Sequence, residues 1–187
     1  MTETVTLRQG LPDEMQFLLR AHPRETWPDH PNFARSVQNW MGAHATFRTL
    51  ASYVTEDTAR FLDKEIDERT YAHTLAKYGH ILIRNLHGHH TWEDRTFFPE
   101  LGAAEGRLQR GLDILEADHE ALDATLDSFA RGANRVVQLA QLSPVDVARE
   151  VPGVEKDAAT IAALLDRHLA DEEDLVVPII LEHRLRG

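Results

Sequence analysis

Two segments of the chain place a histidine four residues before a glutamate, and each glutamate stands six residues before a proline. The pairs are His89/Glu93 and His168/Glu172. Positions i and i+4 of an α-helix lie on one face, so the imidazole and the carboxylate of each pair point the same way, one turn apart. Imidazole nitrogens and carboxylate oxygens are ligands of first-row divalent metals. The repeated pair therefore predicts a metal site that two helices build together.

Two isolated histidines, His44 and His119, extend this set. Both fall at core-facing positions of their predicted helices, where a lone ionisable group is costly unless it is paired or bound to a metal. The predicted metal ligands are His44, His89, Glu93, His119, His168 and Glu172. The competing interpretation is that these histidines fill the core and form hydrogen bonds with the two glutamates.

The number and type of these donors favour a pair of metal ions. Six protein ligands are too many for one tetrahedral zinc ion and too few to saturate two octahedral ions. We expect Glu93 and Glu172 to bridge two ions, with the histidines divided between them and some positions open to a small ligand. The donor types suit iron, manganese or zinc better than copper(I).

Four segments must position these residues, and all four show the period of an amphipathic helix. Apolar residues recur at steps of three and four over residues 33–54, 75–97, 108–129 and 154–179. The alternation typical of a strand is nowhere sustained. The pattern predicts an all-α protein, an up-down antiparallel four-helix bundle. Residues 1–31 are predicted to form an N-terminal arm with a short helix, and residues 32–187 to form the bundle.

The turns between these helices place the histidines at one level. In an antiparallel pair, two residues are level when the turn lies midway between them. The midpoints between successive histidines of the set fall at Asp67, within 102–106 and at Ser143-Pro144. Asp67 is a good helix N-cap, and glycine and proline mark the other two midpoints. The four histidines are therefore expected near one depth of the bundle.

Other acidic and histidine residues leave alternatives open. His90 lies one step from the core-facing stripe and has Asp94 four residues on, so His90/Asp94 is a rival pair. The distance to the following proline favours His89, but His90 remains a candidate fifth imidazole or an outer partner of a ligand. Asp123 is a further candidate ligand. His80 lies on a polar helix face and is predicted to be solvated.

Composition limits the class of protein. The 187 residues suit one domain with a sizeable core, and 31 acidic against 20 basic side chains give a net charge of −11. That excess disfavours nucleic acid or an anionic membrane as a partner. Cysteine is absent, so disulfides and thiolate ligands are excluded, and no apolar stretch approaches a membrane span. We expect a soluble, cytoplasmic protein whose oligomeric state is open.

Residues 33–185 resemble the hemerythrin-like, or HHE cation-binding, domains. The likeness rests on His44, the two His-x-x-x-Glu segments before a proline, and the Asp118-His119-Glu120 segment. The resemblance implies a non-haem di-iron centre with an oxo or hydroxo bridge, and manganese or zinc would share the same ligands. It also implies binding of dioxygen, a related diatomic molecule or a peroxide, in oxygen or iron binding, sensing or storage.

One departure from the oxygen-carrying members of the family concerns the third long helix. Those proteins have two histidines four residues apart there, whereas here His119 is followed by Asp123. The fifth imidazole is missing from that place, which implies a weaker ligand set or an extra solvent position on one iron. Two alternatives to a binding protein therefore stay open. One is a redox enzyme of the same centre, acting in peroxide or nitric oxide reduction or in iron-centre repair. The other is a metal-free helical interaction module.

Overall fold

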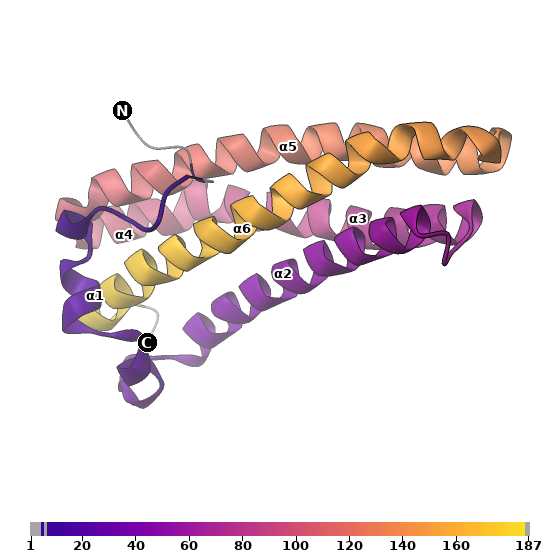
Figure 1. Cartoon of the computed structure of the whole chain (residues 1–187). Helices are drawn as coiled ribbons and strands as arrows, with labels where there is room; N and C mark the ends of the chain where they lie inside the picture. Colours follow the sequence, from indigo (N-terminus) through magenta and orange to yellow (C-terminus); the bar gives the residue numbers. More distant parts are fainter. Residues whose placement is uncertain (1–4, 6, 186–187) are drawn as a thin grey trace. The chain divides into compact units, whose positions relative to one another are not determined.

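A computed structural model describes Val5 and residues 7–185, and within them the chain is all-helical with no strand. Figure 1 shows the six α-helices. They are α1 (Phe17–Ala21), α2 (Arg35–Leu62), α3 (Glu68–Trp92), α4 (Phe98–Ala104), α5 (Gln109–Leu142) and α6 (Val147–His183). The 3₁₀-helices are η1 (Asp13–Met15), η2 (Arg24–Asp29), η4 (Gly106–Leu108) and η5 (Pro144–Asp146), and η3 (Glu93–Phe97) is a π-helix. The all-α class is confirmed.

The four long helices, α2, α3, α5 and α6, are the four segments whose period predicted amphipathic helices. Their turns fall at the predicted places. Asp67 precedes α3, and its Oδ1 accepts a hydrogen bond from the Thr70 backbone N–H at 2.7 Å, as a cap does. Pro144 opens the turn between α5 and α6. No helix in the described part of the chain combines the length and apolarity needed to cross a bilayer.

The contacts within the chain divide it into two compact units. Unit 1 takes in Met1–Ala45, His90–His119 and Asp166–Gly187, as far as these ranges are described, and unit 2 takes in Thr46–His89 and Glu120–Leu165. The boundaries fall inside continuous helices, so each long helix contributes one segment to each unit.

Unit 2 has a closely packed helical core. Tyr71 and Phe129 are fully buried, and the Tyr71 hydroxyl lies 3.1 Å from Thr58 Oγ1. Burial raises the pKa of Tyr71 to about 12, so the phenol stays neutral. A Cβ at Gly79 would lie 3.1 Å from the Phe129 ring, so the glycine lets α3 approach α5 closely.

Unit 1 contains the N-terminal arm, and the arm packs on the end of α6. The arm contributes Leu11, Met15, Leu18 and Trp27 to the same apolar cluster that holds the end of α6. Helix α1 lies beside the C-terminal end of α6 in Figure 1.

Polar contacts fix the same arrangement. His22 Nε2 lies 2.8 Å from Glu182 Oε2, and Asn32 Nδ2 donates to the Leu181 carbonyl at 2.8 Å. The arm is therefore held on the end of α6 by apolar packing and by polar side-chain contacts.

Candidate metal centre

Two groups of side chains offer donor atoms close enough together to hold a metal ion, and within each group these atoms lie within 4.8 Å of one another. The first group is His90, His119 and His168, and the second is His44, His89, Glu93 and Glu172. The groups contain all six residues predicted from the sequence, together with His90. All seven are buried except His89, which is half-buried.

Every long helix supplies at least one of these residues. His44 comes from α2, His89 and His90 from α3, Glu93 from η3, His119 from α5, and His168 and Glu172 from α6. The π-helix η3 begins at Glu93, and such wide turns interrupt α-helices frequently at functional sites. His89 precedes Glu93 by one helical turn, as the predicted pairing requires.

Outer carboxylates fix the rings of His119 and His168. His119 Nδ1 lies 2.7 Å from Asp94 Oδ1, and His168 Nδ1 lies 3.4 Å from Asp118 Oδ2. Burial opposes the ionisation of Asp118, but the hydrogen bonds from His168 and Arg8 lower its pKa below the usual value. A carboxylate only accepts, so each ring carries its proton on Nδ1 and presents the Nε2 lone pair on its other side.

The two Nε2 atoms of His119 and His168 lie 3.1 Å apart. If both rings carry the proton on Nδ1, neither Nε2 can donate, so two lone pairs face each other. Burial lowers the pKa of His168, more than Asp118 raises it, which keeps this imidazole neutral. Neutral rings in this arrangement repel, whereas a cation bound to both nitrogens would be stabilised. The separation suits two nitrogens bound to one ion at about 2.1 Å each.

His44 shows the same arrangement in the second group. Its Nδ1 lies 3.0 Å from Glu173 Oε1, and its Nε2 lies 3.4 Å from Glu172 Oε2. Burial opposes ionisation of Glu173, but hydrogen bonds from His44 and Arg24 lower the pKa of Glu173 to about 2. Glu173 therefore stays ionised as the outer partner, and His44 presents Nε2 to the group.

Glu93 and Glu172 each approach both groups. Glu93 Oε2 lies 3.7 Å from His119 Nε2, and Glu172 Oε2 lies 3.8 Å from His168 Nε2. Both side chains are fully buried. A carboxylate within reach of two sets of imidazoles has the position that a bridging ligand needs.

The charges of this centre favour a cation. Burial raises the pKa of Glu172 well above its usual value, and the facing carboxylate of Glu93 raises it further. Neither oxygen of Glu172 accepts a hydrogen bond from the residues that the structure describes. Two buried carboxylates side by side repel unless one holds a proton or a cation lies between them. The residues present therefore fit a metal centre.

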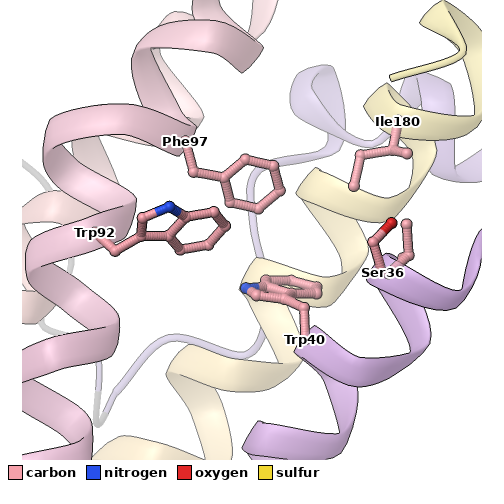
Figure 2. A pocket seen from close by; sticks show the side chains of 6 residues that line it. Ser36, Trp40, Trp92, Phe97 and Ile180 are labelled. Carbon is pink, nitrogen blue, oxygen red and sulfur yellow. The ribbon is translucent and has the colours of Figure 1, made fainter. Parts of the chain in front are cut away.

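An apolar pocket of about 190 Å³ is lined in part by Trp40 (Figure 2). Its lining residues are Ser36, Val37, Trp40, Trp92, Phe97 and Ile180. Trp40 Nε1 donates a hydrogen bond to Glu93 Oε1 at 2.7 Å. In Figure 2 Trp92 and Phe97 lie side by side, and their ring centres are 4.8 Å apart. Trp40 thus both lines this pocket and donates to a candidate metal ligand.

The structure also places the residues that the sequence left open. His90 lies in the first group, where its ring stacks on His119 with the centres 4.0 Å apart. Asp123 joins neither group; its Oδ1 lies 3.2 Å from His87 Nδ1 on a half-exposed surface. Thus α3 brings in a fifth imidazole, and His89 and His90 are not rivals because each lies in a different group.

An all-helical chain with buried histidines and glutamates grouped in this way has the features of a cation-binding helical protein. Residues 35–180 match the family described as the hemerythrin HHE cation binding domain. The match covers most of the chain, which therefore belongs to this family, as the sequence resemblance indicated. No curated protein and no solved structure gave a match.

Proposed function

We propose that the chain binds two iron ions and uses them to take up dioxygen or a related small diatomic molecule or peroxide. The observation that carries this proposal is the convergence of imidazole nitrogens on two shared, buried carboxylates. In this proposal His90, His119 and His168 hold one ion, His44 and His89 hold the other, and Glu93 and Glu172 are shared. The up-down antiparallel four-helix bundle and a cytoplasmic location are part of the same proposal.

A bound ferrous pair would supply electrons and open coordination positions. The protein's own residues orient and shield that centre. Asp94 and Asp118 hold two imidazole rings with Nε2 toward the centre, and Trp40 holds one oxygen of Glu93. In the metal-free protein the raised pKa of Glu172 lets this carboxyl keep a proton, so loading with metal would release it to solvent.

Anaerobic titration with ferrous iron tests the proposal directly. We expect saturation at two ions per chain, followed on exposure to dioxygen by a charge-transfer band in the near ultraviolet. If no iron binds, the proposal is wrong and the chain is a metal-free helical module. Saturation at one would mean that the two groups do not act as separate sites.

A second candidate is a redox enzyme that acts on a small apolar substrate. The pocket beside Trp40 favours it, because about 190 Å³ is far more than a diatomic molecule needs, when water occupies about 30 Å³ in the liquid. The two functions differ in turnover. A binding protein gives a spectral change that reverses when dioxygen is removed, whereas an enzyme consumes its oxidant continuously when substrate is supplied.

Replacing His90 tests the fifth imidazole. His90→Ala removes one of three nitrogens from the first group, so bound iron should fall from two ions per chain towards one. His87→Ala is the matched control, because His87 lies one turn away on α3 and pairs with Asp123 instead. Elemental analysis after gel filtration measures the result. If His90→Ala retains two ions, His90 is a packing residue and the first group has only two imidazole ligands.

A further inference from the structure

We propose that Arg8 and Arg24 of the N-terminal arm are positioning residues of the metal centre. Each holds the carboxylate that orients one histidine ligand. This inference rests on the proposed function, because it assigns a role to residues that surround the same site. It makes the arm a part of the centre rather than an appendage of the helical domain.

The first contact runs from Arg8 to His168. Arg8 is 6% exposed, and its Nη1 and Nη2 donate to the two oxygens of Asp118 at 3.2 and 2.5 Å. Asp118 Oδ2 in turn faces His168 Nδ1. The fork of a guanidinium fixes both the position and the plane of a carboxylate, which a single contact does not. Arg8 Nε also donates to Asp171 Oδ2 at 2.7 Å, so the arginine is anchored on α6.

The second contact runs from Arg24 to His44. Arg24 Nη1 donates to Glu173 Oε2 at 2.8 Å, while the other oxygen of Glu173 faces His44 Nδ1. Arg24 also donates to Asp174 Oδ1 at 2.6 Å and to the Ala170 carbonyl at 3.0 Å. These three contacts fix the guanidinium over one turn of α6. One arm arginine therefore supports each group, through His168 in the first and His44 in the second.

The two arginines also neutralise buried carboxylates around the centre. Asp118, Asp171 and Glu173 are all buried. Buried carboxylates without a cationic partner are costly, and they would compete with Glu93 and Glu172 for protons or for metal. With the arginines in place, the outer carboxylates are neutralised and stay directed at the histidine rings. Outer partners of this kind typically change metal affinity by about 10–100-fold.

Two substitutions in the full-length chain test the inference. Arg8→Met and Arg24→Met keep an apolar stem and remove the donors. We expect both, loaded with ferrous iron, to release it to a chelator about tenfold faster than the wild type, the lower end of the range for outer partners. We also expect an altered visible spectrum when cobalt(II) is bound, because the histidine rings move. A purely structural role would lower the melting temperature and leave that spectrum unchanged.

Arg20→Met is the matched control. Arg20 is an exposed arginine of the same arm that donates to the Asp13 carbonyl at 3.1 Å, and it touches no carboxylate of the centre. It should release iron at the wild-type rate. The inference is wrong if Arg8→Met and Arg24→Met behave like Arg20→Met while the wild type binds two ions. If the wild type itself binds no iron, the proposed function fails first, whatever the variants do.

A double-mutant cycle shows whether Arg8 acts through Asp118. Asp118→Asn and the Arg8→Met/Asp118→Asn double variant should release iron at the same rate, because the arginine has lost the group through which it acts. Rates that multiply would show that Arg8 acts independently, and would overturn this part of the inference.

A milder change keeps the test decisive if Arg8→Met does not fold. Arg8→Lys is then the test. A lysine keeps the charge but cannot bind both carboxylate oxygens as the guanidinium does, so this variant should release iron faster than the wild type. A wild-type rate and spectrum in Arg8→Lys would contradict a positioning role.

Discussion

Glu93→Ala should remove more metal than the loss of a single histidine ligand, and His168→Ala is the histidine variant to compare with it. Glu93 lies in the second group, and its Oε2 is 3.7 Å from His119 in the first. Loss of Glu93 should therefore weaken the binding of both ions. His168 supplies one nitrogen to the first group alone. We expect Glu93→Ala to retain well under one ion per chain and His168→Ala about one. Elemental analysis of protein reloaded with ferrous iron measures both.

His80→Ala is the control for this pair. His80 lies on the exposed face of α3, so this variant should retain two ions per chain. Equal losses from all three variants would mean that the losses come from unfolding rather than from missing ligands. Circular dichroism at the loading temperature separates these cases.

Glu172→Gln should stabilise the metal-free protein while it lowers the metal content of the centre. In the wild type this buried carboxyl faces Glu93, and the two charges repel. The amide introduced by Glu172→Gln can donate to Glu93 instead, so the variant should melt higher by a few degrees, about the effect of 1 kcal/mol in a domain of this size. Its metal content should fall, because an amide is a poor substitute for a bridging carboxylate. Calorimetry of the metal-free protein and elemental analysis measure the two effects.

The gain from Glu172→Gln should depend on pH in a defined direction. The folded-state pKa of Glu172 is raised above its usual value of 4.5. Its contribution to stability is therefore fully present below about pH 4.5 and is lost as the pH rises towards the folded-state pKa. The difference in melting temperature between variant and wild type should be small at pH 4.5 and should grow as the pH rises. Glu155→Gln, on the exposed face of α6, should show no such growth. A difference in melting temperature that shrinks as the pH rises would contradict this account.

Helical periodicity was enough to predict the long helices and the facing of most ligands. The residues at steps of three and four from Leu108, at the end of η4, to Phe129 in α5 are all buried, and His119 lies among them. The turns at Asp67 and Pro144 fell where capping and breaker residues placed them. Position along a helix follows from local rules, so a single sequence is sufficient for it.

His90 shows where periodicity loses resolution. The buried face of a helix is at least about 100° wide, and adjacent residues are about 100° apart, so both His89 and His90 can reach the interior. The sequence pattern favoured His89 over His90 as the ligand of this helix, whereas the structure places one of them in each group. Whether all the predicted residues bind metal stays a prediction, as do the boundary at residue 31 and the absence of nucleic acid and membrane partners.

The role of the arm could not be predicted from the sequence, because its contacts with α5 and α6 do not follow a periodic residue pattern. Arg8 and Arg24 meet carboxylates more than a hundred residues away, and such pairs leave no local pattern. One signal was present in α6. Residues 175–177 and 179–181 are apolar on every side of the helix, and all are buried. A helix that is apolar all round must be covered all round, so a further segment had to lie against it.

The hydrogen bond between Trp40 and Glu93 gives the protein an optical reporter of its own. Indole emission depends on the charge and motion of groups bonded to its N–H, so the fluorescence of Trp40 should respond when Glu93 binds a metal ion. Trp27 lies in the arm, buried in the apolar cluster that holds the end of α6, so its emission should change if the arm leaves α6. Occupancy of the centre and attachment of the arm thus each have a tryptophan as a native fluorophore.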